Sequence, residues 1–503
     1  MWLTALVVTP QVIARAVRLA ALLATCALTA AGCSILADYP DSRLPGADGG
    51  TTFVAWQKLP CSTPAAAPAP AATPPGIRVR YPANRTLSPI TPFVADNLLR
   101  IAARHPGRLT NVFMRIGDSI SVNTNFLNCL TSQPPFAATS ESTWLNLADH
   151  TALRPTIDYF AACVGETTPF ERTSIAAQGG TGTAYALGDT PPRIDQEDAA
   201  LGGPQFAVVM YGTNDLGLNA DPASQQLKFN SSDGYPHWYL TLVDALLDRG
   251  IVPILTTIPP KTTSPQIFDL VPSFNAVVRG IAEARQVPLV DWNREMLKIS
   301  DLGLQGDGTH PYVDPISSCD LSAAAVLKFP YNSRNLLTLE TLEELRKVFV
   351  DHAGGLEAAD PAQDMALSGA GTLASPWVAT ALPFTDVRDL ATVTTKDLTD
   401  YPGCAGAPAQ PGPEAVYQLK LTRTVRLRAF VSSKLATLPL RVNLLQGSAT
   451  GAACAASEAT VISRTLAPGT WYFTVDATQA AVAPGGDYFF GIVECEIDDS
   501  TCN

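Results

Sequence analysis

The sequence predicts a parallel β-sheet covered by helices on both faces, followed by a smaller all-β sandwich. Between residues 85 and 355, short and nearly continuous apolar runs alternate with stretches in which apolar residues recur at helical spacing. Strands that are apolar throughout are buried on both faces, and alternation of strands with helices is typical of parallel sheets. From residue 356 onward, short runs alternate apolar with polar residues and are separated by Gly and Pro, which favours half-buried antiparallel strands.

Residues 1–33 have the features of an export signal. Arg15 and Arg18 precede an apolar run that ends at Leu28, and this run is too short for the roughly 20 residues that a membrane-spanning helix needs. The run continues into Leu28-Thr-Ala-Ala-Gly-Cys33, which resembles a bacterial lipoprotein processing site. Two outcomes stay open: lipidation of Cys33, or ordinary signal cleavage after Ala31.

Residues 34–84 are expected to form a linker, because their Pro/Ala-rich tract at 62–76 is typical of an extended spacer without a core. Eight cysteines follow Cys33, and no C-x-x-C pair occurs among them. This pattern favours disulfides in an oxidising compartment over a zinc site. The sequence leaves the pairing of the cysteines open.

The first folded domain is expected to span residues 85–355. Thr91-Pro92 has the form of a helix start, with proline at the first helical position. The apolar residues of 264–285 recur at helical spacing, as in an amphipathic helix. The predicted strands are 112–116, 206–211, 251–255 and 287–290, and the predicted helices are 91–104, 236–249, 264–285 and 337–352.

The second domain, residues 356–503, is expected to be the all-β sandwich. Segments 412–417 and 466–473 resemble the bacterial prepeptidase C-terminal type of domain, which accompanies many secreted enzymes and is not itself catalytic. If the two domains are separate units, deletion of residues 356–503 should leave an active, soluble first domain. The predicted strands are 415–421, 425–431, 440–445, 470–475 and 488–493.

The first candidate for chemistry is Ser119, in Gly117-Asp-Ser-Ile-Ser121. This segment follows directly on a predicted strand, so Ser119 is expected at the carboxyl edge of the sheet, where its hydroxyl is exposed. Backbone N–H groups at a helix start there can receive negative charge. The alternative is that Asp118 or Ser119 only caps the next helix.

Two further segments carry polar side chains after predicted strands. In Tyr211-Gly-Thr-Asn-Asp215, the side chain of Asn214 can donate an N–H to the same edge of the sheet, although an Asn-Asp turn is the alternative. In Asp307-Gly-Thr-His310-Pro311, a carboxylate three residues before a histidine can hold Nδ1–H and leave Nε2 for a serine. A nucleophilic serine needs such a base, and the base needs an orienting group.

These three segments, in this order, resemble the SGNH (GDSL-type) hydrolase family over roughly residues 110–315. The resemblance implies a three-layer α/β/α fold, with Ser119 as nucleophile, His310 as its base and Asp307 as the group that orients the base. It also implies an oxyanion hole formed by the N–H of Ser119, the side chain of Asn214 and a glycine N–H.

The glycine of the oxyanion hole is expected in Gln178-Gly-Gly-Thr-Gly-Thr183. Gly182 is selected, because the glycine of this family usually precedes a Thr- or Asp-containing helix start. For Gly179 and Gly180 a flexible turn is the preferred interpretation.

The predicted function is that of a secreted or lipid-anchored bacterial serine esterase that works through an acyl-enzyme, without a metal or an organic cofactor. The formal net charge of −12 argues against nucleic acid as a partner. The favoured substrates are O-acyl, especially acetyl, groups on carbohydrate, and lipidated Cys33 would attach the chain to a membrane. The alternatives are a lipase or phospholipase, and an inactive surface protein that binds carbohydrate.

Overall fold

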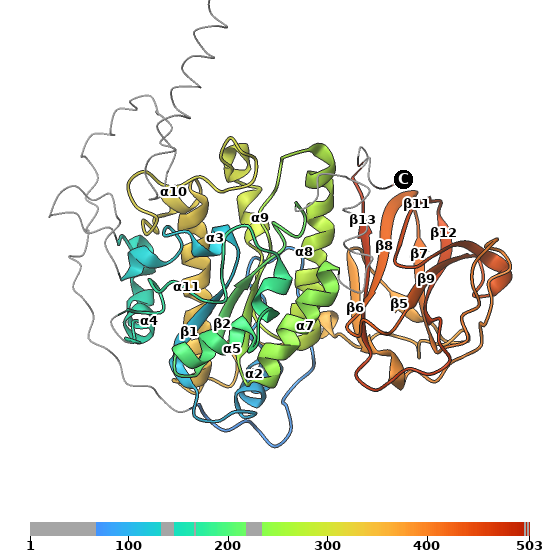
Figure 1. Cartoon of the computed structure of the whole chain (residues 1–503), viewed down its shortest axis with the longest axis horizontal. Coiled ribbons are helices and arrows are strands. Elements are labelled where there is room, and N and C mark those ends of the chain that lie inside the picture. Colours follow the sequence, from blue (N-terminus) through green and yellow to red (C-terminus); the bar gives the residue numbers. More distant parts are fainter. Residues whose placement is uncertain are drawn as a thin grey trace, which may run out of the picture. The chain divides into compact units, whose positions relative to one another are not determined.

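The computed structural model describes residues 67–131, 145–164, 167–217, 234–496, 499 and 502 (Figure 1). The predictions for the export signal, for Cys33 and for most of the linker lie outside these residues. No helix in the described part of the chain combines the length and the apolar character that crossing a bilayer requires.

The first sheet has four parallel strands in sequential order: β1 (Leu109–Gly117), β2 (Pro204–Met210), β3 (Val252–Thr256) and β4 (Leu289–Val290). Every residue of β2, β3 and β4 is buried, as the continuous apolar runs predicted. The expected parallel sheet is therefore confirmed. Because the strands are parallel, their carboxyl ends meet at one edge, where polar loops can converge.

Helices lie on both sides of this sheet (Figure 1). Connections between neighbouring parallel strands are right-handed, so α5, α7 and α8, which join successive strands, cover one face. Helix α11 contacts α4, α9 and β4. The helices are α2 (Pro92–Ala102), α3 (Ser119–Val122), α4 (Arg154–Phe160), α5 (Arg193–Ala200), α7 (Tyr235–Asp248), α8 (Pro265–Arg285), α9 (Trp292–Met296), α10 (Ala323–Val326) and α11 (Pro330–Phe349).

Helix α11 begins seven residues before its predicted start at 337. Its first turns are polar, and the apolar pattern that predicts a buried helix starts only at Leu337. The polar residues Asn332, Arg334 and Asn335 are nevertheless buried. They form hydrogen bonds with α3 and with loops on the carboxyl side of the sheet, which compensates for their desolvation.

The second domain has two sheets, ordered β10-β9-β12-β7-β5 and β11-β8-β13-β6, and the expected β-rich domain is confirmed. Neighbouring strands in these sheets are antiparallel, except that β5 pairs with β7 in parallel. All five predicted strands are present. The four that were not predicted, β5, β6, β10 and β11, are the edge strands of the two sheets. Edge strands are short or carry charged residues, so their apolar alternation is weak. The strands are β5 (Trp377–Ala379), β6 (Phe384–Asp389), β7 (Glu414–Leu421), β8 (Val425–Ser433), β9 (Leu440–Gln446), β10 (Cys454–Glu458), β11 (Val461–Leu466), β12 (Gly469–Ala477) and β13 (Asp487–Glu494).

Helix α8 packs directly against β6 and β13 of the second domain. A Cβ atom on Gly280 would lie 2.7 Å from Thr385 and 2.8 Å from Phe489, so the helix backbone approaches the strands closely. Phe430 and Phe489 stack on each other and belong to the same apolar core as the parallel sheet. The two domains therefore share part of one core.

Charged groups at this junction are paired as well. Arg285 at the end of α8 forms ion pairs with Asp244 of α7 and, at 2.5 Å, with Asp487 of β13. Lys434, which directly follows β8, approaches the same Asp244 to 2.6 Å. Together Arg285 and Lys434 hold the pKa of Asp244 below its usual range, despite the opposing effect of burial.

The end of the predicted linker packs against this core. Val79 and Tyr81 are buried. The backbone N–H of Val79 donates to the side chain of Gln286 at 3.0 Å, and the Tyr81 hydroxyl donates to the carbonyl of Val287 at 2.9 Å. These residues follow the Pro/Ala-rich tract and lie alongside the end of α8.

Disulfides occur in both domains. Cys129–Cys319 joins two loops of the first domain, whereas Cys404–Cys454 and Cys495–Cys502 lie within the second. Cys163 is disulfide-bonded too. None of the three bridges whose two cysteines are described links the domains.

Candidate active site

Ser119 lies at the carboxyl end of β1, as the first residue of the short helix α3. Asp118 caps this helix: its side chain accepts the N–H of Ile120 at 3.0 Å, and its carbonyl accepts those of Ser121 and Val122. The cap therefore comes from Asp118, which leaves the Ser119 hydroxyl for another partner.

That partner is His310. The Ser119 Oγ lies 2.9 Å from Nε2 of His310, and Nδ1 of the same ring lies 2.6 Å from Oδ2 of Asp307. The other carboxylate oxygen of Asp307 accepts the backbone N–H groups of Thr309 and His310, each at 2.9 Å. The structure thus brings all three predicted catalytic residues into one hydrogen-bonded line.

The Asp307 carboxylate is stabilised in its ionised form. Partial desolvation raises its pKa, but the hydrogen bonds from the His310 ring and from the backbone of His310 and Thr309 outweigh this effect, so the pKa lies below its usual value. An ionised Asp307 keeps a proton on Nδ1 of His310, which leaves Nε2 as the acceptor for the serine hydroxyl.

The glycine-rich segment approaches Ser119 by extending the edge of the sheet. Ala177 forms a parallel bridge with Gly117, and the N–H of Gln178 donates to the carbonyl of Gly117 at 3.0 Å. Gly179 follows at once. A Cβ atom on Gly179 would lie 3.6 Å from the Cβ of Ser119, so this glycine lies against the candidate nucleophile.

Gly182, which the sequence favoured for the oxyanion hole, is placed differently. It precedes the short helix Thr183–Leu187, as expected, but a Cβ atom there would lie 2.8 Å from Oδ1 of Asp215. The selection of Gly182 rested on its position before a helix start. The register along the edge of β1 instead brings Gly179 to Ser119, and local sequence does not reveal that register.

Asn214 lies in the loop after β2 and reaches the same segment. Its Nδ2 donates to the carbonyl of Thr181 at 3.0 Å. An amide nitrogen carries two N–H donors, so a second one remains for a ligand. The neighbouring Asp215, whose role was not predicted, accepts the N–H of Thr183 at 3.0 Å and also its hydroxyl. The pair Asn214-Asp215 therefore holds the glycine-rich segment in place.

Behind Ser119 lies a buried pair of charges. Burial raises the pKa of Asp118 to about 6, although the Ile120 N–H and the positive charge of Arg334 oppose this. Arg334 of α11 is fully buried, donates to the carbonyl of Ile120 at 2.9 Å and to the Ser121 hydroxyl at 3.2 Å, and lies over the Phe126 ring. A role for Arg334 was not predicted, because a single charged residue soon after Pro330 gives no sign in the sequence that it is buried.

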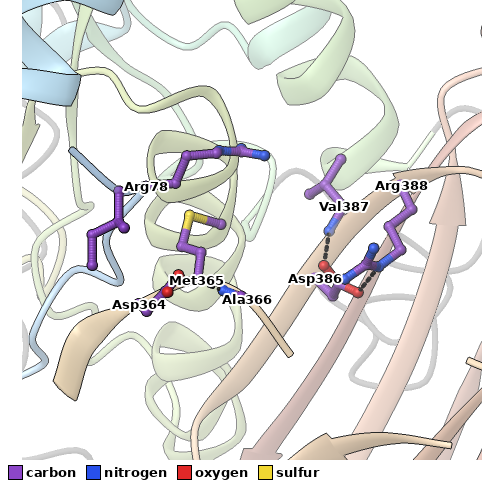
Figure 2. Close-up of a pocket in the computed structure, with 8 residues that line it drawn as sticks. Arg78, Asp364, Met365, Ala366, Asp386, Val387 and Arg388 are labelled. Carbon is purple, nitrogen blue, oxygen red and sulfur yellow. Dashed lines mark hydrogen bonds and ion pairs between the residues drawn. The ribbon is translucent and has the colours of Figure 1, made fainter. Parts of the chain in front are cut away.

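A cavity of about 290 Å³ lies elsewhere, between residues 77–78, 364–366 and β6. Figure 2 shows its charged residues, among them Asp386 and Arg388, which form an ion pair at 2.5 Å. The Tyr417 hydroxyl also donates to Asp386, at 2.9 Å, and the guanidinium of Arg388 stacks on Trp377. These charges are matched within the protein, and the cavity contains none of the catalytic candidates.

In the described part of the chain, one group of three side chains converges in the manner of metal ligands: Cys495, Asp499 and Cys502. The two cysteines form a disulfide with each other. They therefore offer no thiolate, and this group does not fit a metal ion.

Comparisons with known proteins give a family match for part of the chain. The sequence model of the family described as GDSL-like lipase/acylhydrolase matches residues 116–313. No curated protein matches the chain.

Solved structures offer distant similarities. A GDSL-like lipase from Bacteroides thetaiotaomicron is 14% identical, with 50% of this chain and 98% of that chain covered and a TM-score of 0.28. An acetylxylan esterase from Geobacillus stearothermophilus is 18% identical, with coverages of 46% and 93% and a TM-score of 0.28. The pre-peptidase C-terminal domain of a collagenase from Bacillus anthracis is 14% identical, with coverages of 22% and 89% and a TM-score of 0.15.

Proposed function

We propose that the chain removes acyl groups from carbohydrate through an acyl-enzyme on Ser119. The premise is that residues 116–313 match the GDSL-like lipase/acylhydrolase family and that the chain is a serine ester hydrolase. The proposed catalytic residues rest on the 2.9 Å contact between Ser119 Oγ and His310 Nε2, with Asp307 hydrogen-bonded to the other nitrogen of the ring.

In the proposed reaction, His310 takes the proton of Ser119 as its Oγ attacks the ester carbonyl. Asp307 stabilises the imidazolium that forms, and it keeps the ring in the productive tautomer. His310 then gives the proton to the leaving alcohol. Water, activated by the same ring, releases the acid and restores Ser119.

The negative charge on the tetrahedral oxygen requires donors that are already in place. The proposed donors are the backbone N–H groups of Ser119 and Gly179 and the second N–H of the Asn214 side chain. The position of Gly179 against Ser119 and the hydrogen bond from Asn214 to Thr181 support this set. Gly179 replaces Gly182 in this proposal.

Two observations favour an ester on a large, soluble molecule. The side chains of His310 and Asp307 are 39% and 48% exposed, so the base that protonates the leaving alcohol is open to a bulky alcohol such as a polysaccharide. The net charge of −12 also disfavours approach to anionic lipid surfaces. An acetyl group on carbohydrate is the proposed substrate.

One observation favours the second candidate, a lipid acyl ester. Val313 and Ile316, on the loop that follows His310, are 37% and 50% exposed. Apolar side chains that face solvent beside a catalytic histidine could contact an acyl chain.

A chain-length series distinguishes these candidates. The wild type and Ser119→Ala are assayed on p-nitrophenyl esters from acetate to palmitate and on acetylated xylan. The proposal expects acetate release from the polysaccharide, highest activity on acetyl esters, and no activity with Ser119→Ala. Activity that increases toward palmitate would favour the lipid ester, and equal activity of Ser119→Ala would overturn the assignment of the nucleophile.

We further propose that the protein is exported, either secreted or anchored through a lipid on Cys33. The disulfides support an oxidising compartment. Metabolic labelling with a fatty-acid probe tests the anchor: the wild type should take up the label and Cys33→Ser should not. A wild type that takes up no label would indicate ordinary cleavage.

A further inference from the structure

The loop between β3 and α8, residues 257–264, contacts both the turn that carries Asn214 and the turn that carries Asp307 and His310. Lys261 in this loop is only 6% exposed, and its Nζ donates to the carbonyl of Thr213 at 2.9 Å. Thr213 directly precedes Asn214. A buried ammonium group is costly unless it is hydrogen-bonded, so this contact holds the lysine and the Thr213 carbonyl in a defined relation.

The Lys261 ammonium lies inside the turn that carries Asn214. This turn, residues 212–217, is closed by the N–H of Leu216 on the carbonyl of Gly212 at 2.8 Å, and by that of Gly217 on the carbonyl of Asn214 at 2.9 Å. A Cβ atom on Gly217 would lie only 2.0 Å from Lys261 Nζ. Position 217 therefore leaves the space that the ammonium fills.

The next residue contacts the loop of the base. The N–H of Thr262 donates to the carbonyl of Gly308 at 2.8 Å, and a Cβ atom on Gly308 would lie 2.8 Å from the Thr262 hydroxyl. Gly308 follows Asp307 and lies within the turn that places His310. One short segment thus touches both the Asn214 turn and the Asp307–His310 turn.

We propose that Lys261 is a positioning residue for ester hydrolysis, which acts by holding the backbone from which Asn214 reaches the oxyanion. This inference rests on the proposed function. Removal of the ammonium would release the Thr213 carbonyl and let the Asn214 amide drift from its donor position. A donor displaced by about 1 Å stabilises the transition state much less, whereas ground-state binding changes little.

The test is a double-mutant cycle between Lys261→Met and Asn214→Ala, with kcat and KM measured on the best ester of the wild type. We expect Lys261→Met to lower kcat by roughly 10- to 100-fold with KM within about twofold. Because Lys261 acts through Asn214, the double variant should be no slower than Asn214→Ala alone, within about twofold.

Gly217→Ala provides a second route to the same effect, in case Lys261→Met fails to fold. The added methyl group displaces the ammonium while the charge is retained, so kcat should fall without a change in KM. Lys434→Met is the matched control: it also removes a hydrogen-bonded ammonium, which contacts Asp244 at the domain junction, and kcat should stay unchanged.

Two results would overturn the proposal: a folded Lys261→Met variant with kcat within twofold of the wild type, or effects of Lys261→Met and Asn214→Ala that multiply. Either result would leave the proposed function intact, provided that the wild type hydrolyses esters and Ser119→Ala does not. A wild type without hydrolysis that depends on Ser119 would instead reject the proposed function, and this inference with it.

Discussion

Gly179 lies against Ser119, with 3.6 Å between the Cβ of the serine and the position of a Cβ atom on the glycine. The contact arises because Ala177 and Gln178 pair with Gly117 along the edge of β1. It brings the backbone of Gly179 to the serine from a segment some 60 positions further along the chain, whereas Gly182 lies against Asp215.

The two glycines should respond differently to alanine. At Gly179 a methyl group meets Ser119 at an ordinary contact distance, so Gly179→Ala should fold normally and lose kcat, because the methyl group crowds the oxyanion. At Gly182 the methyl group would lie 2.8 Å from Asp215 Oδ1, so Gly182→Ala should lower the melting temperature by displacing the cap on Thr183. Kinetics and thermal melts on both variants check this. A larger loss of kcat in Gly182→Ala than in Gly179→Ala would favour the prediction from sequence that Gly182 belongs to the oxyanion hole.

Asp307→Asn should reduce kcat less than His310→Ala. The asparagine variant keeps the base but no longer enforces its tautomer, and in chymotrypsin-type proteases such a change lowers kcat by roughly 10⁴. Loss of His310 removes the base itself. Steady-state kinetics on both variants measure the order, and small, equal effects would mean that this turn is only structural.

Asn214→Ala should lower kcat by roughly 10²–10³ with KM little changed, which is the usual effect of losing one oxyanion donor. Asn97→Ala on α2 is a matched control, because Asn97 also donates its side-chain amide to a backbone carbonyl, that of Arg285 at 3.0 Å. The control should retain kcat. A rise in KM at constant kcat would assign Asn214 to ground-state binding.

Glu344→Gln should stabilise the protein, and the gain should grow as the pH rises from about 4.5 to about 8. Burial, followed by the charges of Glu357 and Glu340, raises the pKa of Glu344 to about 8, while Arg85 and Lys347 oppose this. When the pKa of an acidic group is raised in the folded state, the folded protein becomes less stable as the pH rises from the ordinary pKa of the group to the raised one. The glutamine variant has no such loss.

Thermal melts at pH 8.5 and pH 5 measure this difference. The melting temperature of Glu344→Gln should lie about 1–3 °C above that of the wild type at pH 8.5 and close to that of the wild type at pH 5. Glu343→Gln is the matched control: Glu343 pairs with Lys347 at 3.2 Å, so its neutralisation should give no gain. Equal gains at both pH values would contradict the raised pKa.

The junction of the domains changes the expected effect of removing residues 356–503. The sequence predicted an active, soluble fragment. In the structure, deletion would remove Phe430 and Phe489 from the shared core and would leave Arg285 without Asp487. A chain that ends at Gly355 should therefore aggregate or melt well below the full chain. Light scattering and thermal melts check this.

Broken disulfides would not explain such a loss. Both described bridges of the second domain close within the deleted part, so the count of free thiols should match that of the full chain. A truncated chain with unchanged melting temperature and activity would show that the domains are independent.

The strands of the fold were predictable to different degrees. Central strands such as β2 and β12 pack apolar side chains against their neighbours, so their patterns are visible in the sequence. The edge strands β6 and β11 contain charged residues, and only their partners define them as strands. The start of α11 escaped prediction for a related reason, because its buried polar residues bind loops from distant parts of the chain.

The sequence by itself determined the fold class and the candidates Ser119 and Asn214, because polar residues that directly follow apolar strands gather at the carboxyl edge of a parallel sheet. It also gave Asp307 and His310, through the spacing of a carboxylate three residues before a histidine. Three features were decided only by the tertiary structure: Gly179 against Ser119, Lys261 against the Asn214 turn, and α8 packed against the second domain. Each of these is a contact between segments far apart in the chain. Its existence depends on strand register and helix packing, which the residues on either side do not encode locally.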